Sequence, residues 1–168
     1  MKNRAVFLDR DGVINIDKEY VYKKEDFVFM PDVFDTLRYL QSKGYLLFIV
    51  TNQSGIARGY YTENDFLSLS KYMLEEFSSN GVTITKLYYC PHAPEANCEC
   101  RKPNPKMLFD AQKEFDIDMS ASWLIGDKTS DIEAGLRAGV GNLIYMGEGE
   151  CEKAHKIKSL KEVTKFIL

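Results

Sequence analysis

The chain has 168 residues, of which 45% are hydrophobic and 28% charged, as expected of one globular domain with a full apolar core. The net charge of −3 argues against a nucleic-acid partner, because it provides no broad basic surface. The longest apolar run covers only residues 45–50, too short for a signal-peptide core or a membrane span. We therefore expect a cytoplasmic protein with no membrane partner, whose four cysteines are metal ligands or bystanders and do not form disulfides.

Short apolar strands alternate along the chain with amphipathic helices. The predicted strands are Ala5–Leu8, Tyr45–Val50, Ile84–Tyr89, Trp123–Ile125 and Leu143–Tyr145. This alternation predicts an α/β fold with a single doubly wound, Rossmann-like parallel sheet, in which ligands bind at the carboxyl ends of the strands. Because no repeat, low-complexity stretch or linker interrupts the pattern, we expect one domain over residues 1–168.

Four helices are expected between these strands, and a short helix at the C-terminus. Their approximate ranges are 33–42, 62–77, 104–115 and 130–138. Gly44 is expected to end the first, and Thr62 with Asp65 forms a capping-box pattern at the start of the second. Asn104 is the expected N-cap of the third, with Pro105 at its first helical position.

Two aspartates, Asp9 and Asp11, follow the first predicted strand directly and precede Gly12. The strand would aim Asp9 out of the carboxyl end of the sheet, and the glycine permits a sharp turn. This arrangement suits an aspartate nucleophile with a second aspartate as general acid and base. A calcium loop is disfavoured, because Val13 stands where such a loop needs an oxygen ligand and no glutamate closes it.

Polar groups also follow the next three strands: Thr51–Ser54, Cys90 with His92, and Gly126–Lys128. Each group alone is more often a turn or a helix cap. Four such groups along one rim instead indicate a functional site.

The chemistry expected at this rim is phosphoryl transfer. Asp9, Asp11 and Asp127 would repel one another unless a cation lay among them, and Mg²⁺ is the natural ion when a substrate brings phosphate oxygens. Thr51 and Lys102 could then stabilise the transferring phosphoryl group.

Residues 90–100 form a second constellation, in which Cys90, His92, Cys98 and Cys100 supply three thiols and one imidazole. These ligands suit tetrahedral Zn²⁺ in a closed structural site, whereas the alternative is a loop that merely contains cysteines. A disulfide between Cys98 and Cys100 would be strained. Zinc would hold the two cations that follow, Arg101-Lys102, over the rim.

Asp9-x-Asp11-Gly12, Thr51-Asn52-Gln53-Ser54, Lys102 and Gly126-Asp127-x3-Asp131 resemble the four motifs of the haloacid dehalogenase-like phosphatases. The zinc loop is similar to that of the subgroup containing D-glycero-D-manno-heptose 1,7-bisphosphate phosphatases and histidinol-phosphate phosphatases. The resemblance covers about residues 5–145. The gaps between the motifs leave no room for a cap domain, so specificity must come from loops.

The phosphate-binding turn at Thr51–Gly59, the loop at Asn15–Val21 and Lys128 resemble the heptose branch. The five residues between His92 and Cys98 resemble the shorter loop of the histidinol branch. The implied function is Mg²⁺-dependent removal of the 7-phosphate of heptose 1,7-bisphosphate, for lipopolysaccharide or capsule biosynthesis. A histidinol-phosphate phosphatase and a non-catalytic phosphosugar-binding relative remain alternatives.

The resemblance also implies residue roles. Asp9 would be nucleophile and Mg²⁺ ligand, and Asp127 a further ligand. Asp11 would be general acid and base, with its backbone carbonyl on the metal. Thr51 and Lys102 would stabilise the phosphoryl group, while Asp131 would orient the lysine. The partner would be a small phosphorylated sugar, bound by a monomer. The implied substrate contacts are Asp17, Lys18, Glu19, Tyr20, Asn52, Gln53, Ser54, Arg101 and Lys128.

Overall fold

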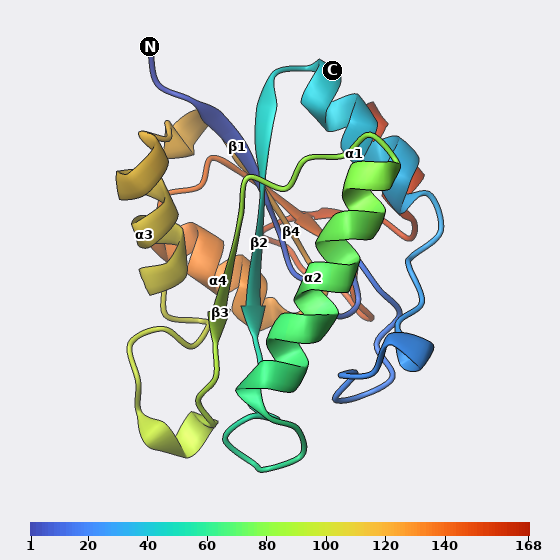
Figure 1. The fold of residues 1–168 in the computed structure, drawn as a ribbon. Helices are drawn as coiled ribbons and strands as arrows, with labels where there is room; N and C mark the ends of the chain where they lie inside the picture. The colour runs from blue at the N-terminus through green and yellow to red at the C-terminus, as the bar shows by residue number, and fades with distance from the viewer.

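The computed structural model describes residues 1–168 as one six-stranded parallel sheet with helices on both faces (Figure 1). The strand order is β3-β2-β1-β4-β5-β6. The strands are β1 (Arg4–Leu8), β2 (Tyr45–Asn52), β3 (Lys86–Cys90), β4 (Trp123–Gly126), β5 (Asn142–Tyr145) and β6 (His155–Lys156). The predicted α/β fold is confirmed, and no cap domain covers the sheet.

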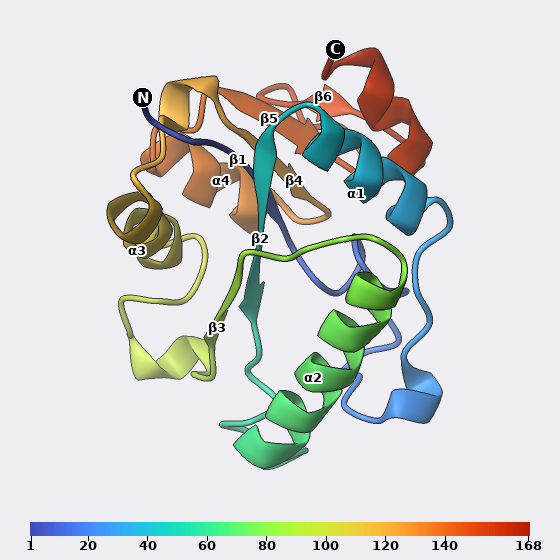
Figure 2. The ribbon, with the colours of Figure 1, turned by 45° about the horizontal axis from the view of Figure 1, so that its top comes forward.

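Helices cover the two faces in pairs, as Figure 2 shows. α1 and α2 pack on one face together with a C-terminal 3₁₀ helix, and α3 and α4 pack on the other. The α-helices are α1 (Val33–Ser42), α2 (Glu63–Ser79), α3 (Lys106–Phe115) and α4 (Thr129–Arg137). The 3₁₀ helices are Lys24–Asp26, Pro94–Ala96, Met119–Ala121 and Leu160–Lys165.

The central strands are buried on both faces, which explains why they are apolar along their whole length. In β1, Val6 and Leu8 face the layer of α1 and α2, whereas Ala5 and Phe7 face the layer of α3 and α4. Alternate residues of a strand point to opposite faces, so one short run supplies both cores. The paired cores fix the position of each strand end.

The helix starts show where local patterns succeed and fail. Thr62 and Asp65 form the predicted capping box of α2. The prediction for α3 is wrong by one residue, because the helix begins at Lys106 and Pro105 occupies the N-cap. The Asn104 side chain does not cap this helix; its Nδ2 donates to the Cys98 carbonyl at 3.0 Å.

The sheet edge holds one further difference, since β6 was not predicted. Its two residues pair with β5 through Ile144 and Tyr145. The segment is too short and polar to show an alternating pattern. None of the helices combines the length and apolarity needed to cross a bilayer.

The strands run from the end where both termini lie toward the opposite end, where the loops after β2 and β3 gather (Figure 1). The order of the strands reverses between β1 and β4, which are hydrogen-bonded neighbours. In open parallel sheets the crevice at such a reversal is the usual ligand site. The polar residues after β1 and β4 therefore meet at this crevice.

Candidate active site

Asp9 directly follows β1 and is largely buried. Its Oδ1 accepts the backbone N–H of Arg10 at 2.9 Å and the Nζ of Lys102 at 3.0 Å. Asp9 and Asp127 have carboxylate oxygens within 4.8 Å of one another, in a cluster that also includes Asp131. The structure thus brings Asp9 and Asp127 together, but the third carboxylate of this cluster is that of Asp131 and not, as expected, that of Asp11.

Gly12 permits the close approach of the loops after β1 and β4. Its φ of +91° lies in the left-handed region, and a Cβ at this position would be 2.0 Å from the Asp127 Oδ2. Any other residue would displace the Asp127 carboxylate. The requirement for glycine is therefore both conformational and steric.

Lys102 lies at the centre of the buried charges. Its Nζ contacts the Asp131 Oδ1 at 2.6 Å and donates to the Val50 carbonyl at 2.8 Å, in addition to its contact with Asp9. Burial works to lower the pKa of Lys102, but the negative charges of Asp131 and Asp9 outweigh it and raise that pKa. The ammonium is thus held charged beside the Asp9 carboxylate.

The Asp9 carboxylate is poorly stabilised as an anion. Burial, followed by the charge of Asp131, raises the pKa of Asp9 well above its ordinary value, although Lys102 opposes the shift. Burial also raises the pKa of Asp127. Asp127 Oδ1 is buried and has no hydrogen-bond partner. A crowded, under-compensated set of oxygens is what a hard divalent cation would stabilise.

Asp11 points its carboxylate away from the acidic cluster and toward three donors. Oδ1 accepts from the Nη2 of Arg10 at 2.9 Å and the Nδ2 of Asn15 at 3.0 Å. Oδ2 accepts from the Nε2 of Gln53 at 3.2 Å. The Asp11 carbonyl oxygen accepts no backbone hydrogen bond, so it remains available to a metal.

Asn52 ties the end of β2 to the segment that carries Lys102. Its Oδ1 accepts the Lys102 backbone N–H at 3.0 Å, and its Nδ2 donates to the Lys102 carbonyl at 3.3 Å. The sequence predicts a substrate contact for Asn52; its amide is used here on the protein's own backbone. This anchor fixes Lys102 from the side of its main chain.

A polar cleft of about 470 Å³ opens beside these groups. It brings together eight of the nine predicted substrate contacts, and Lys18 is the one that does not line it. Three further lining residues were missed by the sequence reasoning: Arg58, Tyr61 and Ser130. Nothing in the local pattern marks them, although Arg58 belongs to the Thr51–Gly59 turn. The predicted residues that line the cleft are Asp17, Glu19, Tyr20, Asn52, Gln53, Ser54, Arg101 and Lys128.

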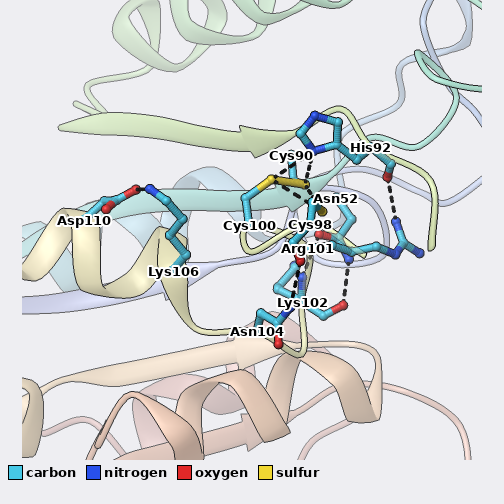
Figure 3. The surroundings of a disulfide bond; sticks show 10 residues. All are labelled: Asn52, Cys90, His92, Cys98, Cys100, Arg101, Lys102, Asn104, Lys106 and Asp110. Atoms are coloured by element: carbon cyan, nitrogen blue, oxygen red, sulfur yellow. Dashed lines mark hydrogen bonds and ion pairs between the residues drawn. A yellow bond between two sulfur atoms is a disulfide. The ribbon is translucent and has the colours of Figure 1, made fainter. Parts of the chain in front are cut away.

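Residues 90–100 bring Cys90, His92, Cys98 and Cys100 together, with ligand atoms within 4.8 Å of one another (Figure 3). Contrary to the expectation of no disulfide, Cys90 and Cys100 are joined by one, and Cys98 remains a free thiol beside it. The disulfide lies within the group of four side chains that the loop brings together. Arg101 leaves this cluster and donates from Nη1 to the His92 carbonyl at 3.4 Å.

Comparisons with known proteins agree with this geometry. Residues 99–164 match the HAD-hydrolase-like family model. A D-glycero-alpha-D-manno-heptose-1,7-bisphosphate 7-phosphatase of Campylobacter jejuni is 54% identical, over 99% of this chain and 97% of that protein. The corresponding beta-anomer phosphatase of Helicobacter pylori strain 26695 is 47% identical, over 98% of each chain.

Solved structures resemble the whole chain as well. A D,D-heptose 1,7-bisphosphate phosphatase from B. bronchiseptica, solved with magnesium and phosphate, superimposes with a TM-score of 0.88 at 26% identity, covering 98% of this chain and 97% of that one. A HAD-like phosphatase from Mesorhizobium loti gives a TM-score of 0.88 at 32% identity, covering 99% and 85%. The relatives, which are about half identical to this chain over nearly its whole length, show that it belongs to the D-glycero-D-manno-heptose 1,7-bisphosphate 7-phosphatase family of the haloacid dehalogenase-like hydrolases.

Proposed function

We propose that this protein is a Mg²⁺-dependent phosphatase that removes the 7-phosphate of D-glycero-D-manno-heptose 1,7-bisphosphate. The observation that carries the proposal is the buried Asp9 carboxylate, which lies 3.0 Å from the Lys102 ammonium beside the polar cleft. Relatives of nearly the same length are named for this substrate. The product would feed heptose into lipopolysaccharide or capsule synthesis.

The chemistry can be assigned to the chain's own residues. The free oxygen of Asp9 attacks phosphorus, and the bond from phosphorus to the sugar oxygen breaks as that oxygen takes a proton from Asp11. Asp11 then removes a proton from water, which attacks the phosphoryl group and releases it from Asp9. Thr51 and Lys102 stabilise the charge that develops on the phosphoryl oxygens.

Mg²⁺ fits the oxygen donors at the crevice. Asp9, Asp127 and the Asp11 carbonyl would hold it, because Asp127 Oδ1 is buried without a hydrogen-bond partner, and burial together with the charge of Asp131 raises the pKa of both Asp9 and Asp127. When bound, the ion neutralises the carboxylates and polarises phosphoryl oxygens.

Zn²⁺ fits the second cluster, and we propose that the four side chains bind it as thiolates and imidazole. Zn–S bonds of about 2.3 Å and Zn–N bonds of about 2.0–2.1 Å give tetrahedron edges of roughly 3.5–3.8 Å. Four of the six edges between these ligand atoms measure 3.4–3.9 Å here. A zinc-bound loop requires Cys90 and Cys100 in the reduced state, since each thiolate is a ligand. Elemental analysis of reduced protein should find one zinc per chain; its absence would contradict the site.

The non-reacting phosphate would be held by arginines at the cleft. Arg58 and Arg101 line it from different loops, and each guanidinium makes a single hydrogen bond of 3.4 Å to the protein. Free N–H donors in this arrangement suit a phosphate, which arginine binds in a bidentate manner. We therefore expect a bisphosphate to be preferred over monophosphates.

The test is a comparison of kcat/KM for both anomers of heptose 1,7-bisphosphate and for histidinol phosphate. The bisphosphate should be the better substrate. Arg101→Ala should raise its KM by roughly one to two powers of ten, the value of a charged hydrogen bond, and affect small monophosphates less. Arg137→Ala, on the outer face of α4, is the matched control. Higher kcat/KM for histidinol phosphate would overturn the substrate assignment and favour the branch that the short zinc loop resembles.

A further inference from the structure

The carboxylate of Asp11 is immobilised before any substrate is bound. Arg10 and Asn15 hold one oxygen and Gln53 holds the other. Arg10 and Asn15 are both almost completely buried, so neither can swing away without unpacking. Of the three residues that bind the Asp11 carboxylate, only Gln53 lines the cleft.

Gln53 itself is only 3% exposed, and its amide makes three hydrogen bonds, which include both of its donors. Nε2 donates to the Asp11 Oδ2 at 3.2 Å and to the Thr51 Oγ1 at 2.9 Å. Oε1 accepts the Tyr61 hydroxyl at 2.5 Å. A buried amide with these three contacts has little capacity left for a ligand.

The orientation of this amide follows from charge. If it were reversed, Oε1 would face the Asp11 carboxylate, and two acceptors would oppose each other without a proton between them. With Asp11 ionised, as it is when it removes a proton from water, Nε2 therefore faces Asp11 and the Tyr61 hydroxyl donates to Oε1. Tyr61 is itself fixed, since its ring stacks on Tyr22 with centroids 5.3 Å apart and packs against Gly55, where a Cβ would lie 2.1 Å from it.

The same amide sets the direction of the Thr51 hydroxyl. Because Thr51 Oγ1 accepts from Gln53, its own proton is free for another acceptor. Its only protein acceptor is the Asn52 carbonyl at 3.4 Å, a weak contact. A phosphoryl oxygen would be the better partner.

We infer that Gln53, held by Tyr61, is a positioning residue that links the acid/base carboxylate of Asp11 to the hydroxyl of Thr51. This role differs from the substrate contact that the family resemblance implies for Gln53. It rests on the proposed function for the roles of Asp11 and Thr51. It requires that loss of the Gln53 amide weaken proton delivery to the leaving group without weakening substrate binding.

The test uses Gln53→Met, which keeps the length of the side chain and removes its donors and acceptor. Its kcat/KM is measured in the presence of Mg²⁺ for two phosphate esters. One is an alkyl phosphate, whose alkoxide needs a proton to depart; the other is p-nitrophenyl phosphate, whose leaving group does not. A positioned acid contributes about 10²–10⁴-fold, so partial misplacement should lower kcat/KM for the alkyl ester by roughly tenfold or more. The aryl ester should lose markedly less, and KM for the alkyl ester should stay within about twofold.

Tyr61→Phe should also lower the ratio of kcat/KM for the alkyl ester to kcat/KM for the aryl ester, but by a smaller amount, because it removes only the support of Gln53. Tyr22→Phe keeps the stacked ring, and Gln41→Met removes a glutamine that contacts Gly81 and Thr83 far from the cleft. Neither control should change the ratio. Thermal unfolding of each variant separates a loss of fold from a loss of positioning.

Equal losses on the two esters, or a raised KM with unchanged kcat, would overturn the inference. An inactive wild-type protein would instead contradict the proposed function. In that event a crystal structure of Gln53→Met still decides the positioning role, because an Asp11 carboxylate that keeps its place on Arg10 and Asn15 would show that Gln53 is not needed to hold it.

Discussion

The pair formed by Lys102 and Asp131 offers the sharpest test of how the site is held. Their side chains are 4% and 3% exposed, and Nζ lies 2.6 Å from Oδ1. Asp131→Asn keeps the shape of the side chain and removes its charge. The lysine would then remain buried with less compensation.

The magnitude follows from what the lysine retains. Removing one partner of a buried ion pair costs about 3–5 kcal/mol, because the other charge stays desolvated. Lys102 keeps the Asp9 oxygen at 3.0 Å and the Val50 carbonyl at 2.8 Å, and the loss of the Asp131 charge relieves repulsion on Asp9, so the lower end of this range applies. The Lys128 N–H, which donates to Asp131 Oδ2 at 3.1 Å, can still donate to an asparagine oxygen. A loss of about 3 kcal/mol corresponds to a fall in Tm of roughly 6–12 °C for a chain of this size.

Urea and thermal unfolding of metal-free protein at pH 7 measure this loss. Asp110→Asn is the matched control, because it breaks an exposed pair with Lys106 of similar length, 2.8 Å, on the surface of α3. Exposed helical pairs contribute only about 0.3–0.5 kcal/mol. An Asp131→Asn protein no less stable than Asp110→Asn would refute the claim that buried charge compensation holds Lys102.

Three further outcomes are expected. Asp9→Asn should lower turnover by a factor on the order of 10⁶, as for other catalytic nucleophiles, while leaving the fold intact. A variant that keeps a tenth of wild-type activity would contradict the role of Asp9 as nucleophile. Asp11→Asn should lose most turnover yet still bind inorganic phosphate with Mg²⁺, measured by calorimetry; unchanged turnover of an alkyl phosphate would exclude it as the acid. The pKa values of Asp9 and Asp127 are raised by burial, so the folded metal-free protein binds their protons more tightly than the unfolded chain. Their contribution to the free energy of unfolding should therefore be fully present below the unfolded aspartate pKa of about 3.9 and should be lost as pH rises through the raised pKa values. Asp9→Asn should reduce this dependence on pH, as measured by urea unfolding at a series of pH values. The same pH dependence in Asp9→Asn and wild type would contradict the assignment.

The sheet could be predicted from the sequence because its signals are local. β1 and β2 are short, apolar and bounded by polar residues, and each strand end carries a residue with recognisable chemistry. Parallel strands share one carboxyl edge, so Asp9, Thr51 and Asp127 had to converge once the strands were identified. The alternation of strands and helices thus predicts which residues gather at the carboxyl edge of the sheet.

What could not be predicted depends on long-range contacts. Asn52 and Lys102 are 50 residues apart, and nothing in either segment shows that the amide of one binds the backbone of the other. Asn104 carries a helix-cap signal but satisfies the Cys98 carbonyl instead. Tyr61 reads as a residue before a helix, whereas it supports Gln53. In each case a tertiary hydrogen bond determined the role of a side chain whose local pattern indicated something else.

Lys102 and Arg101 are anchored differently, so the proposed zinc site should affect the two residues to different extents. Lys102 is held by Asn52 on its backbone and by three partners at its Nζ, whereas the Arg101 guanidinium makes a single 3.4 Å contact, to the His92 carbonyl within that loop. Removing a proposed zinc ligand by Cys98→Ser should therefore release Arg101 and leave Lys102 largely in place. We expect KM for the bisphosphate to rise by roughly one to two powers of ten, the value of a charged hydrogen bond, with a much smaller fall in kcat.

Cys151→Ser, outside the zinc cluster, is the control and should retain wild-type zinc content and kinetics. A Cys98→Ser enzyme whose kcat collapses at unchanged KM would show that zinc positions Lys102. The buried network around that lysine would then be too weak to hold it alone. A raised KM with nearly unchanged kcat would mean that residues at the strand ends carry out phosphoryl transfer without help from the metal. Recognition of the rest of the sugar would then depend on a loop whose conformation the metal stabilises.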